Sequence, residues 1–352
     1  MTSRTQPAVV QYALKPLAVE LREIPVPEIG DDDVLLEVGA VAVCGSDVHQ
    51  AWNTHSWEVN IPVVLGHEFC GTVAKAGRSV KTAREGDRVA CETAARICGS
   101  CLMCRTGRYQ LCPSRKGFGY GVDGAMARFV RVPGRCLHRI PDSLPFETAC
   151  LTEPHAVAYN AMCVNSTIHA GDAVVVLGPG PIGLLCTRMA ALAGADPLIV
   201  AGLGVDAPRL ETAKRLGATA VVDVDREDLG EAVRALRDLG ADLVCDATGA
   251  SIALDMALRI TRPGGQITKV GWSPEEIVID MNPLVLKNLR VQGSFSHNFP
   301  VWERVIHLLD GVLDAPGAIV GLRSSLAGWR DAFDAMHERR VIKSVLVPSM
   351  GD

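Results

Sequence analysis

Four cysteines in one short segment have the spacing of a metal site. They are Cys98, Cys101, Cys104 and Cys112, in the segment CGSCLMCRTGRYQLC. A short loop can fold such a set around one ion, because four thiolates at about 2.3 Å complete the tetrahedral shell of Zn²⁺. No position is then left open for a reacting molecule. The spacing therefore predicts a structural zinc site.

A second set of metal-binding residue types lies outside this segment. It comprises Cys44, Asp47 and His49 in CGSDVH, His67 and Glu68 in GHE, and Glu153 in LTEP. Catalytic zinc has three protein ligands and keeps one position for water or substrate. Cys44, His67 and a carboxylate would form such a set, although a single cysteine is more often a small core residue. The combination predicts a second, catalytic zinc ion.

The segment VVVLGPGPIG predicts a loop that binds a dinucleotide. Gly178, Gly180 and Gly183 form the pattern G-x-G-x-x-G between an apolar run and a helix. The first glycine permits a tight turn, the second lets a pyrophosphate approach the backbone, and the third lets helix and strand pack closely. With Pro181 and Ile182, they would hold the diphosphate at the helix N-terminus. A purely structural glycine turn is the alternative.

The acidic residue that holds the ribose of NAD, about 20 residues after such a loop, is missing from its expected place. The strand expected at Leu198–Ala201 is followed by Gly202. Asp206 could reach the ribose from a longer loop, whereas Arg209 is the nearest cation for the 2′-phosphate of NADP. The choice between NAD and NADP stays open, with NAD favoured.

The elements that must position these residues fall into two regions, and 352 residues suffice for two domains. Up to about residue 150, apolar runs broken by Gly and Pro predict a β-rich region, with runs at Val34–Val38, Val63–Leu65, Arg88–Cys91 and Ala127–Val132. Alternating strands and helices then predict a parallel, doubly wound sheet. The expected strands are Ala173–Val176, Leu198–Ala201, Ala220–Asp223, Leu243–Asp246, Gln266–Val270 and Leu289–Gln292. The expected helices are Glu153–Val164, Leu184–Leu192 after a turn at Gly178–Gly183, Ala207–Leu216, Leu229–Leu239 and Ile252–Arg259, and a tail adds helices Trp302–Gly311 and Trp329–Arg339 and a strand Lys343–Val347.

Composition excludes several functional classes. Apolar residues make up 48% and charged residues 21% of the chain, with a net charge of −5, which is ordinary for a globular protein. Lysine and arginine are scattered, so we expect no nucleic-acid partner. We also expect no membrane association, because no apolar run is long enough to cross a bilayer. The start of the chain has no pattern of a secretion signal, so the twelve cysteines favour metal binding in the cytoplasm over disulfides.

The order of these motifs resembles one enzyme family over essentially the whole chain. GHE followed by G-x-V at residues 66–73, GDRV at 86–89, the four-cysteine segment and GPGPIG are similar to the zinc-containing medium-chain dehydrogenases/reductases. Glu153, at the place of a third zinc cysteine, resembles the sorbitol (polyol) dehydrogenase branch. The resemblance implies an α/β protein that forms a homodimer or homotetramer. It would have a GroES-like β-rich catalytic domain at 1–154, completed by 293–352, and a Rossmann dinucleotide-binding domain at 155–292.

The resemblance also implies two zinc ions per chain and a nicotinamide coenzyme. Cys44, His67 and Glu68 would hold the catalytic ion. Glu153 would be its fourth ligand or a neighbour that binds it through water. The cysteines at 98–112 would hold the structural ion.

Three further residues would act around the catalytic ion. Asp47 would hold a zinc-bound histidine in one tautomer. Ser46 matches the hydroxyl that takes the alcohol proton, and His49 matches the relay that passes it toward solvent.

Departures from the branch mark a candidate substrate pocket. Phe295-Ser296-His297 stands where polyol dehydrogenases have a Phe followed by Arg-Tyr, and Gln50 replaces a tyrosine that often follows the relay histidine. The other candidate pocket residues are His55, Trp57, Phe118 and Tyr120. For these aromatics, core or loop packing is an equally good interpretation.

Three functions are compatible with these residues to different degrees. The first is the oxidation of a secondary alcohol, in a polyol, sugar alcohol or cyclitol, to a ketone, because zinc lowers the pKa of a hydroxyl group that it binds. The second is a biosynthetic ketone or sugar reductase with the same site. The third, a non-catalytic zinc-stabilised nucleotide-binding protein, is disfavoured because Cys44, Ser46 and His67 are all present.

Overall fold

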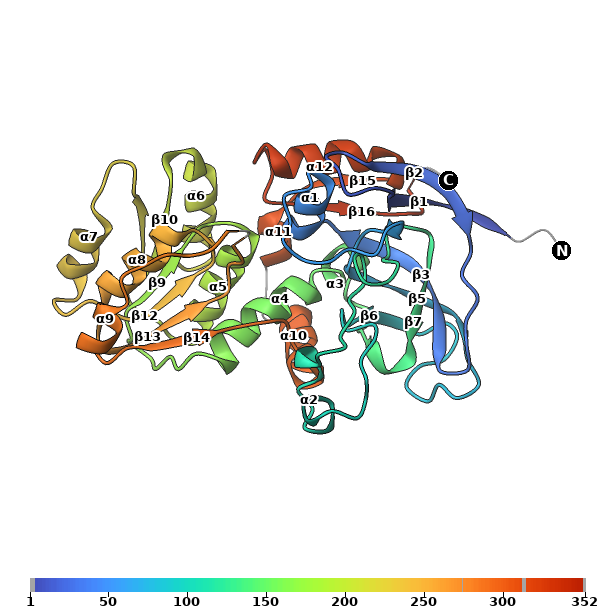
Figure 1. Cartoon of the computed structure of the whole chain (residues 1–352), viewed down its shortest axis with the longest axis horizontal. Helices are drawn as coiled ribbons and strands as arrows, with labels where there is room; N and C mark the ends of the chain where they lie inside the picture. Colours follow the sequence, from blue (N-terminus) through green and yellow to red (C-terminus); the bar gives the residue numbers. More distant parts are fainter. Residues whose placement is uncertain (1–3, 274, 312–314, 351–352) are drawn as a thin grey trace. The chain divides into compact units, whose positions relative to one another are not determined.

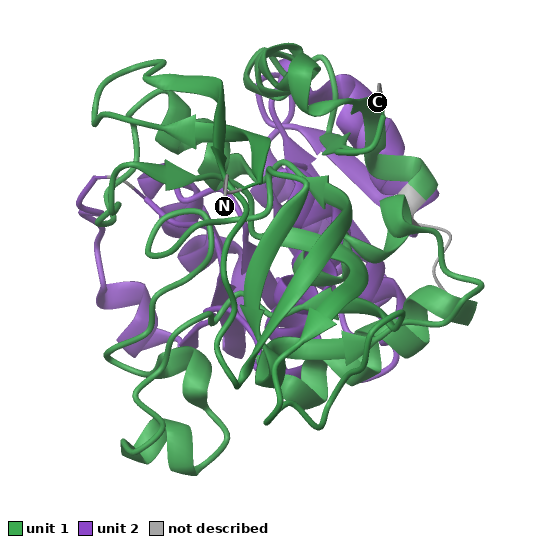
Figure 2. Cartoon of the chain, turned by 90° about the vertical axis from the view of Figure 1, so that its right-hand side faces the viewer, with its two compact units in different colours: residues 1–153, 298–352 green, residues 154–297 purple. Residues whose placement is uncertain are grey.

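The computed structural model describes residues 4–273, 275–311 and 315–350. The chain forms two compact units, coloured separately in Figure 2. Unit 1 comprises residues 1–153 and 298–352, and unit 2 comprises residues 154–297. The expected boundaries lay after residues 154 and 292, so Pro154 and residues 293–297 fall in the other unit from the one expected.

Unit 1 is rich in β-strands (Figure 1). A seven-stranded sheet has the order β15-β16-β3-β5-β6-β8, with β7 paired to β3, and a three-stranded sheet has the order β2-β1-β4. The strands are β1 (Thr5–Gln11), β2 (Val19–Pro25), β3 (Asp33–Ala42), β4 (Val63–Val64), β5 (Glu68–Ala76), β6 (Arg88–Cys91), β7 (Phe129–Pro133), β8 (Leu137–Arg139), β15 (Val320–Ser324) and β16 (Lys343–Leu346). The helices are α1 (Gly45–Ala51), α2 (Leu102–Arg105), α3 (Phe146–Ala149), α10 (Phe299–Gly311), α11 (Ala315–Ile319) and α12 (Trp329–His337), and α4 (Thr152–Tyr159) begins here and continues into unit 2.

The register of the larger sheet brings three distant segments together. Ala42, the last residue of β3, pairs with Glu68 on one side and with Val345 on the other. Both pairings are antiparallel, so Cys44, two residues beyond Ala42, lies at the same sheet end as Lys343, two residues before Val345. Alternate residues of β3 are buried, as in a strand with one face on a core. The sheet thus fixes where the GHE and CGSDVH segments meet.

Unit 2 is a parallel sheet with helices packed on it (Figure 1). Its strand order is β11-β10-β9-β12-β13-β14. The chain starts in the middle at β9, runs outward to β11, and returns to β12 on the other side of β9. Dinucleotides bind at the carboxyl ends of the strands at such a reversal. The elements are β9 (Val174–Leu177), α5 (Pro181–Leu192), β10 (Leu198–Gly202), α6 (Ala207–Arg215), β11 (Ala220–Asp223), α7 (Leu229–Leu236), β12 (Ala241–Asp246), α8 (Ser251–Ile260), β13 (Thr261–Lys269), α9 (Asn282–Leu286) and β14 (Arg290–Gly293).

Two expected helices of unit 2 have different ends. Helix α5 begins at Pro181, so the expected turn at 178–183 is shorter and its last three residues are helical. Proline suits the first helical position because its missing N–H group needs no partner there. Helix α7 ends at Leu236, because Arg237 is extended, and Leu239 lies outside it. The predicted helix was therefore three residues too long at this end.

Two other expected elements are also shifted. Strand β7 begins at Phe129, and Ala127 only forms an isolated bridge with Ala8. The helix expected from Glu153 to Val164 is α4, which ends at Tyr159 and continues as one π-helical turn at Asn160–Val164. Turns of this kind are frequent near functional sites.

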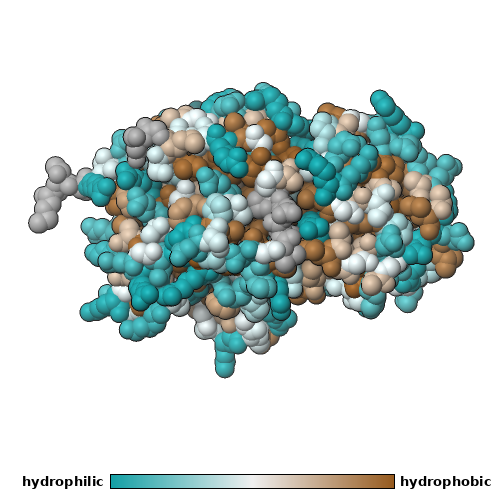
Figure 3. Space-filling view, turned by 180° about the vertical axis from the view of Figure 1, so that it is seen from behind, coloured by the Kyte–Doolittle hydropathy of each residue, from teal (hydrophilic) through white to brown (hydrophobic). Residues whose placement is uncertain are grey.

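Hydrophilic side chains cover much of the face shown in Figure 3, with smaller hydrophobic areas between them. In unit 2, the exposed apolar side chains include Val278, Val285 and Leu286. Within residues 4–273, 275–311 and 315–350, no helix has both the length and the apolar character of a membrane span.

Candidate functional site

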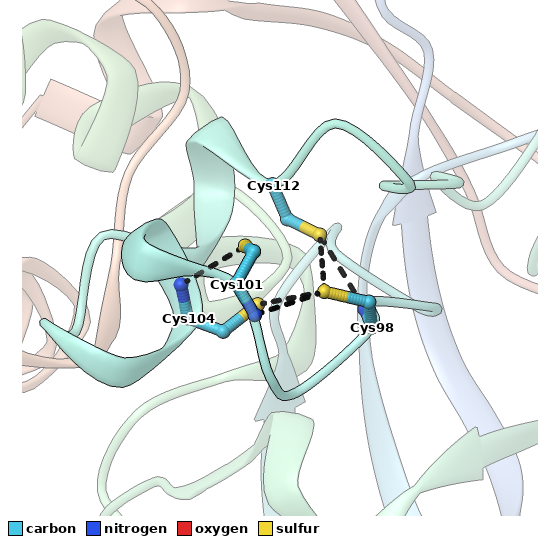
Figure 4. A group of neighbouring side chains, drawn as sticks. All are labelled: Cys98, Cys101, Cys104 and Cys112. Carbon is cyan, nitrogen blue, oxygen red and sulfur yellow. Dashed lines mark hydrogen bonds between the residues drawn. The ribbon is translucent and has the colours of Figure 1, made fainter.

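The four cysteines of residues 98–112 surround a common centre (Figure 4). The Sγ atom of Cys98 lies 3.9 Å from that of Cys104 and 3.6 Å from that of Cys112. A tetrahedron with zinc–sulfur bonds of about 2.3 Å has edges of about 3.8 Å. The sulfur spacing therefore fits a zinc ion.

Backbone N–H groups point at the sulfur atoms of this lobe, residues 98–112. Cys101 donates to Sγ of Cys98 at 3.3 Å, and Cys98 donates to Sγ of Cys112 at 3.4 Å. The backbone N–H groups of Cys101 and Ser100 lower the pKa of Cys98 to about 6. Only the thiolate form binds a metal, so the loop prepares this side chain for one.

A buried histidine connects the lobe to helix α10. Tyr109, inside the lobe, donates to both carboxylate oxygens of Glu92 at 2.8 Å and accepts from the N–H of Phe299 at 2.6 Å. Nε2 of His138 lies 2.9 Å from Glu92, and its Nδ1 lies 2.5 Å from Glu303 of α10. The conformation of the lobe therefore fixes the start of α10.

We expect Cys101→Ser to lower the Tm by roughly 10 °C, because a structural zinc site contributes folding free energy of several kcal/mol. Differential scanning fluorimetry combined with zinc analysis measures this. Cys163→Ser, at an exposed cysteine outside the lobe, is the matched control. An unchanged Tm after loss of one zinc ion per chain would refute the structural role.

A second group of metal-binding side chains lies at one end of the larger sheet. Ligand atoms of Cys44, His67 and Glu68 all lie within 4.8 Å of one another. Cys44 precedes α1, and Glu68 is the first residue of β5. Gly66, just before His67, has φ +93°, and a Cβ there would collide with Val41 and Met126. Only glycine allows the turn that presents this histidine.

Glu68 makes a buried ion pair. Nζ of Lys343 donates to Oε1 of Glu68 at 2.6 Å, and both side chains are almost completely buried. Among the described residues, Oε2 of Glu68 has no hydrogen-bond partner. Burial raises the pKa of Glu68. Burial lowers the pKa of Lys343, but the negative charges of Glu68, Cys44 and Glu153 outweigh this effect, so the pKa of Lys343 is raised. A buried carboxylate oxygen without a partner, beside a thiol and an imidazole, suits a cation.

Asp47 holds both segments that carry these donors. It is fully buried, and its carboxylate accepts from the N–H of Cys44 at 2.9 Å and from the N–H of Gly66 at 3.2 Å. Nδ1 of His67 lies 3.7 Å from Asp47, whereas its Nε2 lies 3.5 Å from Oγ of Ser46. The carboxylate faces one ring nitrogen, which leaves the other for a ligand on the side of Ser46.

His49 lies three residues after Ser46 on α1, so the two share a helix face. Its Nδ1 lies 2.8 Å from Oγ1 of Thr54, and the side chain is exposed. Partial burial and the neighbouring imidazoles of His337 and His55 lower the pKa of His49. Because its pKa is lowered, this imidazole stays neutral, and so able to accept a proton, at a lower pH than an ordinary histidine.

Replacing His337 by Phe should raise the pKa of His49, because a like-charged neighbour is removed while a ring remains to stack on Trp52, 4.1 Å away. The proton-relay role expected from the sequence requires a neutral His49, so in that role the acid limb of the kcat/KM profile should move to higher pH. NMR titration of the His49 ring gives the pKa directly. The control is His307→Phe, on α10, which should leave the pKa of His49 and the kcat/KM profile unchanged. The same pKa for His49 in the parent protein and in both variants would contradict the effect.

Glu153 lies near the second metal group without joining it. It is buried at the start of α4, and its charge raises the pKa values of Glu68 and Lys343. Among the described residues, the group with ligand atoms within 4.8 Å consists of Cys44, His67 and Glu68. Direct or water-mediated binding by Glu153 stays a prediction.

The expected pocket residues of unit 1 have mixed surroundings. Gln50 is buried and donates to Gln11 at 3.1 Å and to the carbonyl oxygen of Gly119 at 3.0 Å, while Trp57 donates to it at 3.2 Å. Phe118 is 1% exposed, in the core, with its edge toward Phe69. The hydroxyl group of Tyr120 accepts a hydrogen bond from Arg115. The burial of Phe118 favours the packing interpretation for that residue, while the pocket role of Gln50 stays a prediction.

The remaining pocket candidates lie in unit 2, after the carboxyl end of β14. The ring of Phe295 is half exposed and lies 6.5 Å from that of Trp272, and His297 is buried. Ser296 has φ +55°, and its carbonyl oxygen accepts from Asn160 of the π-helical turn at 2.8 Å. The turn therefore holds this segment in an unusual backbone conformation.

The glycine loop has the geometry expected of a dinucleotide site. Gly178 has φ +90°, and a Cβ on Gly183 would collide with the carbonyl oxygen of Gly178. A Cβ on Gly180 would meet no atom within 4 Å, so the space beside the loop is open there. Asp206 and Arg209, the candidate partners of the ribose hydroxyl groups and of a 2′-phosphate, lie 3.6 Å apart, and both side chains are mostly buried.

Sequence reasoning missed Lys343 as part of the site. The only signal was a lysine at the start of the apolar run SVLV, in a strand that unit 1 buries completely. A charged residue in a buried strand needs a partner, but nothing local in the sequence identifies Glu68 as that partner.

Comparisons with known proteins agree with both units. The family model for the alcohol dehydrogenase GroES-like domain matches residues 30–142, and that for zinc-binding dehydrogenase matches residues 181–311. D-arabitol-phosphate dehydrogenase of Enterococcus avium is 38% identical over 92% of each chain. Sorbitol dehydrogenase of Halalkalibacterium halodurans is 36% identical over 93% of this chain and 95% of that protein.

A solved structure is similar over its whole length. A zinc-binding dehydrogenase of Sinorhizobium meliloti 1021, bound to NADP, has a TM-score of 0.88 and 31% identity, covering 98% of this chain and all of that one. These matches confirm the expected GroES-like and Rossmann-type fold class. This chain therefore belongs to the zinc-containing medium-chain dehydrogenases/reductases, in a polyol dehydrogenase-like branch, and is an oxidoreductase of secondary alcohols.

Proposed function

We propose that Cys44, His67 and Glu68 hold a catalytic zinc ion at which the secondary hydroxyl group of a polyol is oxidised to a ketone with NAD. The observation that carries this is the approach of three different donors to within 4.8 Å, with the hydroxyl group of Ser46 3.5 Å from His67. Mixed sets of three protein ligands are typical of zinc that keeps one position for a reacting molecule.

The chain's own residues would handle the proton. When bound, zinc supplies Lewis acidity that lowers the pKa of the substrate hydroxyl group. Ser46 would take the proton of that group, and His49, on the same helix face, would pass it toward solvent. Asp47 would hold His67 in one orientation. A nicotinamide coenzyme, held by the glycine loop at Gly178–Gly183, would supply the acceptor for the hydride of the substrate carbon.

The substrate class follows from the relatives and the pocket. Sorbitol dehydrogenase and D-arabitol-phosphate dehydrogenase act on sugar alcohols or their phosphates. We propose a substrate of this class, and sorbitol itself is disfavoured because Ser296 and His297 stand in place of an Arg-Tyr pair.

The test is a screen of polyols, polyol phosphates, cyclitols and simple secondary alcohols with NAD⁺ and NADP⁺ in parallel, followed by the absorbance of the reduced nicotinamide. We expect turnover of at least one polyol or polyol phosphate, and two zinc ions per chain by elemental analysis. Turnover that survives removal of all zinc would refute the proposal.

The chain's assembly and location are also proposals. We propose a homodimer or homotetramer, supported by the short edge strand β14, whose residues are largely exposed, and by the exposed Val278, Val285 and Leu286 of the same unit. Sedimentation velocity would test it. We propose a cytoplasmic location because all twelve cysteines are free.

A further inference from the structure

The usual ribose carboxylate cannot be restored at the end of β10. Gly202 is the last residue of that strand, where nucleotide-binding folds of this type carry an acid. A Cβ on Gly202 would lie 2.8 Å and 2.9 Å from two ring atoms of Pro179 in the glycine loop. The proline ring therefore occupies the space that an aspartate at 202 would need.

The neighbouring strand supplies carboxylates at the same place. Asp223, the last residue of β11, pairs with Gly202 across the parallel ladder. A Cβ on Gly204 would lie 3.3 Å from Oδ2 of Asp223 and 3.4 Å from Oδ2 of Asp225. Oδ2 of Asp225 accepts from the N–H of Gly204 at 2.8 Å, and Oδ1 of Asp223 accepts from the N–H of Asp225 at 3.1 Å. Both carboxylates thus lie against the loop that follows β10.

The cations around this loop are engaged or displaced toward solvent. Arg209, the candidate for a 2′-phosphate, lies 3.6 Å from Asp206 and is mostly buried. Arg226 lies 3.5 Å from Asp223, but its side chain is 83% exposed. Glu227 adds a further acid, which accepts from the N–H of Asp223 at 3.4 Å. Negative charge therefore dominates this edge of the sheet.

We propose that Asp223 and Asp225 replace the missing β10 carboxylate and make the protein selective for NAD over NADP. The inference rests on the proposed function, since it assumes that the glycine loop binds a nicotinamide dinucleotide. The carboxylates accept hydrogen bonds from the adenosine ribose of NAD, whose hydroxyl groups are donors. The 2′-phosphate of NADP would bring negative charge to the same carboxylates, and the repulsion weakens its binding.

The test compares NADH and NADPH binding by isothermal titration calorimetry. Asp223→Asn and Asp225→Asn keep the acceptor oxygens that hold the Gly204 loop, so the double variant removes charge and preserves shape. We expect the parent protein to prefer NADH, and the double variant to lose at least about tenfold of that preference, mainly through tighter NADPH binding. Asp238→Asn, in the loop between α7 and β12 at the amino ends of the strands, is the control for removing a carboxylate elsewhere in unit 2 and should keep the parent ratio.

The outcomes separate this inference from the function on which it rests. An unchanged ratio in a double variant that still binds NADH overturns the inference alone, as does a parent protein that prefers NADPH. A parent protein that binds neither coenzyme overturns the proposed function as well. Because repulsion between charges is screened, the parent preference should fall between about 0.05 and 0.5 M salt, while that of the double variant stays flat. A salt-independent preference in the parent would point to a steric cause and also overturn the inference.

Discussion

A Cys44→Ala variant should fold and bind the coenzyme but turn over at least about a thousandfold more slowly than the parent protein. Lewis-acid activation is worth several kcal/mol, and each 1.36 kcal/mol corresponds to about tenfold in rate. Removing Cys44 takes the only thiolate from the proposed set and leaves His67 and Glu68 as the donors of the three-residue group, which weakens zinc binding. The fold should persist because Asp47 is held by the backbone N–H of residue 44, which alanine keeps.

Elemental analysis and coenzyme titration complete this test. The variant should keep one zinc ion per chain, in the four-cysteine lobe, and an unchanged affinity for NADH. Cys163→Ala, an exposed cysteine in unit 2, is the matched control and should keep full activity and both ions. Activity within about tenfold of the parent would remove Cys44 from the metal site.

The parts of the site that were predictable from the sequence are those whose residues lie close together along the chain. The four thiols span residues 98–112, and the glycine loop spans 178–183, so spacing alone predicted the groupings that the structure shows. The grouping of Cys44, His67 and Glu68 spans 25 residues, and motif order and the family resemblance identified it.

The parts that could not be predicted depend on sheet register. Lys343 and Glu68 are 275 residues apart and meet because β16 and β5 both pair with β3. Asp223 was expected at the end of a strand, but its place beside Gly202 follows from the order of β10 and β11. For Phe118, residue type could not distinguish a pocket wall from a packed interior, and its burial favours the latter.

Replacing Lys343 by Met should lower the free energy of unfolding by about 3–5 kcal/mol, the largest stability effect that we expect from one substitution. The ammonium and carboxylate groups are 2.6 Å apart and almost fully buried, so in the zinc-free protein the change leaves a carboxylate without its partner. Urea denaturation of the chelator-treated parent and variant at pH 7 measures the loss. Lys214→Met is the matched control: Lys214 and Glu211 are also 2.6 Å apart but exposed, and their separation should cost under about 1 kcal/mol.

The loss should depend on pH in a definite direction. Burial raises the pKa of Glu68 and Lys343 opposes that rise, so the substitution raises the pKa further. In the unfolded chain the carboxyl ionises near its ordinary pKa of about 4.3. Above that pH the unfolded chain gives up a proton that the folded variant retains, so unfolding becomes easier as the pH rises. The difference in unfolding free energy between variant and parent should therefore be larger at about pH 8 than at about pH 5.

The double substitution Lys343→Met with Glu68→Gln separates the buried charge from the lost packing. It removes both charges, so it should recover most of the stability and abolish the pH-dependent gap, although it also removes a metal donor and hence activity. If the double variant is no more stable than Lys343→Met alone, the cost comes from misfit of the methionine. An isolated buried charge would then not be the source of the lost stability.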